Sequence, residues 1–211
     1  MNELNLQDWF LLPFFRQILG YREVKANTVT NSLIIEEDLQ EFISQTELNK
    51  KPYETLLKKY RGDKVKLLNE LIELIQERSG SNRNMALFIN ANKSITLRGI
   101  KLNLFYTDDS VIHDNALFAE NIFSVVQELP FKYNFQGKQI FSFRPDLVLF
   151  VNGIYLGYSE LKSNYTNQNA SKNGRGKVIK DYFEAVKIYH QHIDSNGMLS
   201  DKEKELLRKD F

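Results

Sequence analysis

The sequence of 211 residues has no cysteine, four prolines and one tryptophan. The lack of cysteine excludes disulfides, thiolate zinc sites and a cysteine nucleophile, and fits a reducing compartment. There is no Walker-type or dinucleotide-binding glycine motif, so this chain is not expected to bind ATP through such a loop. The densest apolar run, residues 9–15, is too short to span a bilayer, and Glu3 and Asp8 stand where a secretion signal would be basic. We therefore expect a cytoplasmic protein without a membrane partner.

Hydrophobic residues make up 42% and charged residues 26% of the chain, which indicates a packed globular protein rather than a disordered one. The formal net charge is +1, but the charge is unevenly distributed. Residues 131–192 hold nine basic and four acidic side chains, a balance of +5. This segment is where a polyanion would be attracted, unless it is only a solvated basic face.

The hydrophobic pattern favours helices in the first half of the chain and strands after about residue 121. We predict an α/β (α+β) fold with a mixed central sheet flanked by helices, divided into a helical N-terminal lobe (1–84) and a core with C-terminal helices (85–211). The expected helices are 33–42, 52–60, 65–78 and 177–192, with a short charged helix from residue 201. The expected strands are short pieces within 85–105, then 122–133, 139–151 and 154–162, with turns at 134–137 and at 152–153.

Two packing predictions follow from the apolar residues. Both faces of the last hairpin are largely apolar, so its two strands should be central in the sheet. Trp9 and the neighbouring phenylalanines should belong to the core.

Charged residues interrupt this apolar hairpin at Arg144-Pro145-Asp146 and at Glu160-Leu161-Lys162. Burying them is costly unless they pair with one another or hold a metal ion. A plain two-residue turn at Asn152-Gly153 sets Asp146 opposite Ser159, on the wrong face for Glu160. We predict instead a three-residue loop with a bulge at Gly153, or an equivalent irregularity near Pro145, that brings Asp146 next to Glu160.

In that geometry the carboxylates of Asp146 and Glu160, with the Leu161 carbonyl, form an oxygen site suited to Mg²⁺. Lys162 would orient or deprotonate a water and stabilise a phosphate as charge builds, so phosphodiester hydrolysis is the expected reaction. Basic residues of the following loop and helix could hold the flanking phosphates: Lys172, Arg175, Lys177 and Lys180. The alternative interpretation is a structural salt bridge among the three charged side chains.

The segment 143–162, FRPDLVLFVNGIYLGYSELK, closely resembles the nuclease motif of type I restriction enzyme R subunits, members of the PD-(D/E)xK superfamily. Residues 33–60, 97–100 and 121–131 resemble other parts of that domain more loosely. The resemblance implies a restriction-endonuclease-like core and Mg²⁺-dependent DNA cleavage, with Mn²⁺ as a substitute. It implies Asp146 and Glu160 as metal ligands and Lys162 as the catalytic lysine.

Members often carry a Gln-x-x-x-Tyr pair on the next helix. Tyr189 fits the tyrosine, but Ala185 stands at the glutamine position. Some relatives use a glutamate in an early helix, for which Asp8 is a weak counterpart.

A complete subunit of this kind would continue into an ATP-driven translocase and act on double-stranded DNA with modification and specificity subunits. ATP is therefore expected only for the full-length subunit. We expect the chain to be an N-terminal fragment or a truncated product that cuts poorly in isolation. Two alternatives remain open: a nuclease of the same fold in repair or mobile-element cleavage, and a catalytically silent DNA-binding or docking module.

Overall fold

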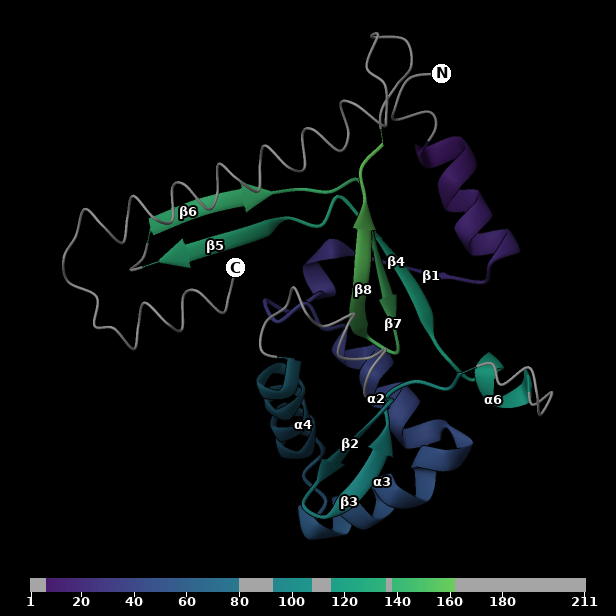
Figure 1. Ribbon diagram of the computed structural model, residues 1–211, viewed down its shortest axis with the longest axis vertical. Helices are drawn as coiled ribbons and strands as arrows, with labels where there is room; N and C mark the ends of the chain where they lie inside the picture. The colour runs from purple at the N-terminus through teal and green to yellow at the C-terminus, as the bar shows by residue number, and fades with distance from the viewer. Residues whose placement is uncertain (1–6, 80–92, 108–114, 136–137, 162–211) are drawn as a thin grey trace, which may run out of the picture. The chain divides into compact units, whose positions relative to one another are not determined.

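The computed structural model describes residues 7–79, 93–107, 115–135 and 138–161 (Figure 1). Its helices are η1 (Gln7–Leu11), η2 (Phe14–Ile18), η3 (Ala26–Thr28), α2 (Glu36–Gln45), α3 (Glu47–Lys59), α4 (Lys64–Ser79) and α6 (Asn115–Ala119). Its strands are β1 (Arg22–Val24), β2 (Ser94–Leu97), β3 (Ile100–Asn103), β4 (Phe123–Gln127), β5 (Phe131–Phe135), β6 (Lys138–Phe143), β7 (Leu147–Val151) and β8 (Ile154–Ser159). Within these residues there is a mixed sheet in the order β1-β4-β7-β8, and two hairpins, β2-β3 and β5-β6. The predicted mixed α/β class is confirmed.

The contacts divide the chain into two compact units. One unit comprises the described parts of 1–20, 126–148 and 158–211, and the other comprises those of 21–125 and 149–157. These units are groups of contacts rather than folding domains, so the expected lobe boundary between residues 84 and 85 stays a prediction.

The helices of the second unit form where the apolar periodicity predicts, with shifted ends. The expected helix 65–78 is α4, and Asp63 caps it by accepting a hydrogen bond from the Lys66 amide at 2.9 Å. The expected helix 52–60 begins earlier, at Glu47, because the extended residue Thr46 already starts the helix, and Pro52 lies inside it. The first expected helix begins later, at Glu36, because Ile34 pairs with Ile154 as extended chain.

The β2-β3 hairpin lies beside α3 (Figure 1). Its turn, Arg98-Gly99, has φ values of 46° and 78°, the left-handed geometry of a tight two-residue hairpin. Asn49 of α3 is fully buried, and its side-chain amide donates to the Asn103 carbonyl at 3.0 Å and accepts from the Asn103 amide at 2.8 Å. The predicted short strands within 85–105 are confirmed, and a buried asparagine ties their end to the helix.

Each of the expected strands 122–133 and 139–151 is divided in two. The first is broken after β4 by Glu128, which has a left-handed φ of 46°, and by Pro130. The second is broken at residues 144–146, where Pro145 has no amide hydrogen to donate to a neighbouring strand. The turn predicted at 134–137 is confirmed by the pairing of Phe135 with Lys138 in the β5-β6 hairpin.

The prediction that both strands of the last hairpin are central is right for β7 and wrong for β8. Within the described residues β8 ends the sheet order, and Leu156 and Tyr158 are 38% and 39% exposed. Only the first residue of β8, Ile154, is paired on its outer side, with Ile34. An apolar pattern on both faces of a strand therefore did not mean that both its edges were covered.

The prediction that Trp9 and its neighbours belong to the core is wrong. Trp9, Phe10 and Phe14 are 80%, 58% and 40% exposed, whereas Gln7 and Leu12 of the same segment are buried. Hydrophobicity alone did not reveal which side of this short helical segment faces the protein. No helix among the described residues is long and apolar enough to cross a membrane.

The Asn152-Gly153 turn is buried and has two residues, so the predicted three-residue loop is wrong. Both residues have positive φ, 51° and 76°. The Asn152 side chain is fully buried, accepts from the Ile122 amide at 2.7 Å and donates to the Leu104 carbonyl at 2.8 Å. The Gly153 carbonyl accepts from the Ile35 amide at 2.8 Å, just before α2. The turn is thus bonded on one side to the start of β4 and on the other to the start of α2.

Gly153 has no room for a side chain, because an added Cβ would lie 2.3 Å from the Ile35 carbonyl oxygen. Gly99 has nearly the same φ in the same kind of turn but no atom within 4 Å of an added Cβ. We expect Gly99→Ala to lower the free energy of unfolding by about 1 kcal/mol through backbone strain, and Gly153→Ala by about 3 kcal/mol because a backbone clash is added. Urea denaturation measures both, and equal losses would show that the close approach to α2 is absent.

A buried acid, Asp38 of α2, belongs to a small charged cluster. Its Oδ2 accepts from the Ser124 hydroxyl at 2.5 Å and its Oδ1 lies 3.4 Å from Nη1 of Arg22. Arg22 also donates to both carboxylate oxygens of Glu41, at 2.6 and 2.7 Å. Burial raises the pKa of Asp38 against the opposing effects of Ser124 and Arg22, whereas the hydrogen bonds from Arg22 lower the pKa of Glu41.

These two shifts predict opposite pH dependences of stability. Asp38 is easier to protonate in the folded chain, so its contribution to stability is complete below its usual pKa of 3.8 and is lost as the pH rises through its raised value. Glu41 contributes above its usual pKa of 4.5, and that contribution is lost as the pH falls through its lowered value. The stability of wild type relative to Asp38→Asn should therefore fall with rising pH, and relative to Glu41→Gln it should rise. Urea denaturation from pH 3 to pH 7, roughly, tests this, and slopes of one sign for both variants contradict it.

Candidate functional site

Asp146 stands just before β7, outside the strand, where the chain leaves β6 and passes the buried Pro145. The Asp146 side chain is half-buried, and its Oδ2 accepts a hydrogen bond from the backbone amide of Leu161. Leu161 follows β8 by two residues. A carboxylate that precedes one strand is therefore bonded to the backbone that follows the next strand.

Glu160 lies between the end of β8 and Leu161, so it is not on the strand where the sequence predicted it. Its residue is half-buried and its Oε1 is buried. Because Asp146 is bonded to the Leu161 amide, it contacts the peptide group that directly follows Glu160. The structure thus brings the Asp146 side chain to the Glu160-Leu161 peptide, at the ends of two neighbouring strands.

The arrangement arises differently from the predicted bulge at Gly153. A two-residue turn would place Asp146 opposite Ser159 if the strand pairing continued. Instead, β7 begins only at Leu147 and β8 ends at Ser159, so neither acid is held to a face of the sheet. The irregularity lies at Pro145, the second possibility that the sequence left open.

The backbone of Asp146 is held by two donors that sequence reasoning missed. Its carbonyl accepts from the Glu128 amide at 3.0 Å and from Nε2 of Gln7 at 3.3 Å. Gln7 is 4% exposed, although it lies at the start of the first described helix. No spacing in the sequence links it to Asp146, because 139 residues separate the two. Asp8, the weak counterpart of an early-helix glutamate, instead accepts from Nε2 of Gln127 at 3.1 Å.

Several predicted site residues lie outside the described part of the chain. They are Lys162, Lys172, Arg175, Lys177, Lys180 and Tyr189, with Ala185 at the expected glutamine position. Their roles therefore stay predictions.

The described residues of this site suit a hard divalent cation. Asp146 and Glu160 supply carboxylate oxygens, and Mg²⁺ prefers oxygen ligands while keeping several waters. One oxygen of Asp146 is oriented by the Leu161 amide, which limits how the carboxylate can rotate. Among the described residues no group of three or more histidine or acidic side chains could hold a metal, so any ion here would rely on two carboxylates, backbone oxygen and water.

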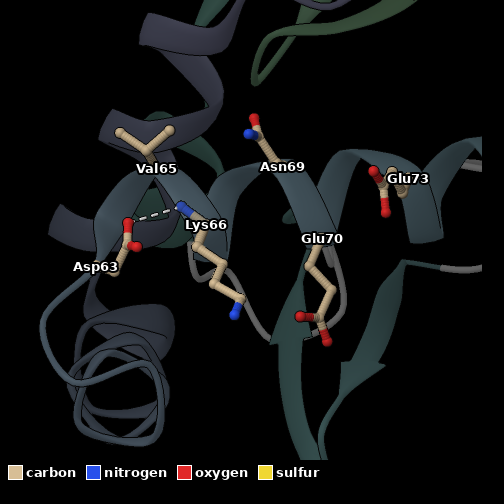
Figure 2. Close-up of a pocket in the computed structure, with 6 residues that line it drawn as sticks. All are labelled: Asp63, Val65, Lys66, Asn69, Glu70 and Glu73. Atoms are coloured by element: carbon tan, nitrogen blue, oxygen red, sulfur yellow. Dashed lines mark hydrogen bonds between the residues drawn. The ribbon is translucent and has the colours of Figure 1, made fainter.

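A second acidic region, a pocket of about 510 Å³ along α4, offers a weaker candidate (Figure 2). It is lined by Asp63, Val65, Lys66, Asn69, Glu70 and Glu73. Lys66 and Glu70 extend from one side of the helix while Asn69 points to the other (Figure 2). Glu70 already binds Arg98 with both oxygens, at 2.9 and 2.6 Å, and Asp63 caps the helix. These acids are used in structural contacts, so the pocket is not a candidate metal site.

Comparison with known families resolves what the site belongs to. The family model described as type I restriction enzyme R protein N terminus (HSDR_N) matches residues 1–203. The chain belongs to this family. It is therefore an N-terminal domain of the R protein of a type I restriction enzyme, a system in which several subunits act together on DNA. No curated protein and no solved structure matched the chain.

Gln7 generates a prediction about this R protein domain. Gln7→Leu keeps the shape of the side chain but removes the donor to the Asp146 carbonyl, and we expect the free energy of unfolding to fall by about 1 kcal/mol. The matched control is Gln127→Leu, which removes the exposed bond to Asp8 and should cost only a few tenths of a kcal/mol, roughly. Chemical denaturation compares the two variants, and an equal or smaller loss for Gln7→Leu would argue against the buried bond.

Proposed function

We propose that this R protein domain is a Mg²⁺-dependent endonuclease that hydrolyses DNA phosphodiester bonds, with Asp146, Glu160 and Lys162 as its catalytic residues. The observation that carries the proposal is the hydrogen bond from the Leu161 amide to the Asp146 carboxylate. It joins the two halves of the charged motif, Arg144-Pro145-Asp146 and Glu160-Leu161-Lys162, which are 15 residues apart along the chain. Membership in a restriction enzyme family makes DNA the substrate to test.

Each residue has a distinct task in this proposal. Asp146 and Glu160 hold the cation, with the Leu161 amide keeping one Asp146 oxygen in place. A bound Mg²⁺ supplies positive charge that stabilises the phosphate as negative charge develops on it. Lys162 orients the attacking water and adds a second positive charge. In the overall reaction a water oxygen bonds to phosphorus, one bridging P–O bond breaks, and the released oxygen takes up a proton.

The remaining predictions concern how the domain engages DNA and its partners. Lys172, Arg175, Lys177 and Lys180 would neutralise backbone phosphates on either side of the cut. In the full-length subunit an ATP-driven translocase would deliver double-stranded DNA, within a complex that includes modification and specificity subunits. The family match favours restriction over the repair or mobile-element alternative. Localisation in the cytoplasm stays a prediction.

Calorimetric titration of the 211-residue chain with Mg²⁺ or Mn²⁺ tests the proposal. We expect weak single-site binding that Asp146→Asn and Glu160→Gln each weaken at least about tenfold, equivalent to about 1.4 kcal/mol, because each removes one anionic ligand. Glu73→Gln is the matched control, since it removes an exposed acid from α4 and should leave binding unchanged.

Cleavage is then measured as Mn²⁺-dependent nicking of supercoiled plasmid. Lys162→Ala should keep metal binding and lose nicking, which separates its role from those of the two acids. Binding that is the same in Asp146→Asn and wild type contradicts the metal site. DNA binding without metal binding or nicking in any variant would support the silent docking module instead.

A further inference from the structure

The first described segment exposes an unusual concentration of large apolar side chains. Of the nine large hydrophobic residues that are exposed in the described chain, five lie in this segment: Trp9, Phe10, Phe14, Ile18 and Leu19. Phe10, Phe14 and Ile18 are four residues apart along η1 and η2, so they lie along one side of the helical segment. The rings of Phe10 and Phe14 are stacked, with centroids 6.3 Å apart and planes within 8°. We call Trp9, Phe10, Phe14 and Ile18 the aromatic face.

The chemistry of the aromatic face fits an apolar partner rather than a nucleic acid. Within residues 7–19 the charged side chains are Asp8 and Arg16, which sum to zero. A surface that binds a polyanion needs an excess of lysine or arginine. Tryptophan and phenylalanine exposed together are instead typical of protein contacts.

The chain itself contains an apolar surface of matching form. Between residues 177 and 193 the sequence places apolar residues at helical spacing: Val178, Ile179, Tyr182, Phe183, Val186, Tyr189 and Ile193. This stripe covers about four helical turns, so it is long enough to meet all of the aromatic face. Polar side chains, including Glu184 and Lys187, fall between its members.

The connection between the two surfaces is short. Gln7 donates to the Asp146 carbonyl and the Leu161 amide donates to the Asp146 side chain. The chain after Leu161 therefore starts beside the residue that anchors the aromatic segment. The 15 residues from 162 to 176 can span about 50 Å when extended, far more than is needed to reach Trp9.

We propose that residues 177–193 form a helix whose apolar stripe packs on the aromatic face of residues 9–18. This contact is independent of the proposed nuclease activity. It closes the polypeptide between Leu161 and the helix into a loop anchored at both ends, and that loop contains Lys172 and Arg175.

Trp9 is the single tryptophan of the chain, so its fluorescence reports directly on this contact. In the intact 211-residue chain we expect blue-shifted emission and protection from acrylamide quenching. Phe183→Asp places a charge in the apolar stripe and should shift the emission to the red and increase quenching. Lys187→Asp is the matched control, because it introduces the same side chain between the apolar positions and should leave both readings unchanged.

The outcomes separate the occupants of the aromatic face. Solvent-like emission of Trp9 in the wild-type chain overturns the proposal, whatever the variants do. Protection that disappears on dilution shows that a second copy covers the face, which also overturns it. Equal protection in Phe183→Asp and Lys187→Asp shows that another part of the protein is the occupant. Far-UV circular dichroism and cooperative urea unfolding establish that Phe183→Asp is folded, and Tyr182→Ser is a milder second variant with the same expected shift.

Discussion

The tight turn at Asn152-Gly153 is the constraint on which the arrangement of the last hairpin depends. It is fully buried, and both of its residues need left-handed backbone, which glycine adopts freely and asparagine tolerates. The Asn152 side chain replaces the missing strand partners of Ile122 and Leu104, while Gly153 lies so close to Ile35 that no larger residue fits. Because a two-residue turn permits one register, the turn also determines where β7 begins and where β8 ends.

The candidate site forms where that regular pairing stops. If the strands had continued, Asp146 and Glu160 would have alternated onto opposite faces. Pro145 cannot donate to a neighbouring strand, so the chain leaves the sheet before β7 and the Asp146 carboxylate is able to reach the Leu161 amide. The left-handed residue Glu128 then supplies an amide to the Asp146 carbonyl. Strained or irregular backbone at a site of this kind is affordable only because surrounding hydrogen bonds hold it.

Buried asparagines perform a similar task elsewhere in the second unit. Asn49 bonds to both backbone groups of Asn103 at the end of β3, and Asn121 bonds to both backbone groups of Tyr106. Asn121 also accepts from Asn152, at 2.9 Å, so two of these residues form one network. Each such bond contributes about 1 kcal/mol net, but leaving a buried backbone group without a partner costs about 1 to 3 kcal/mol. These side chains therefore determine which segments can end next to one another.

Local sequence by itself determined the elements that rest on local physics. The apolar period of α4, the left-handed turns at Arg98-Gly99 and Asn152-Gly153, and the turn between β5 and β6 all follow from neighbouring residues, and the motif at 143–162 resembled the family that the match later showed. Tertiary structure alone decided that Trp9 is exposed, that β8 lies at an edge and that Gln7 holds Asp146. The reason is physical: a turn or an amphipathic helix is set by residues within a few positions, whereas burial and the partner of a buried amide depend on segments that are more than a hundred residues apart, as Gln7 and Asp146 are.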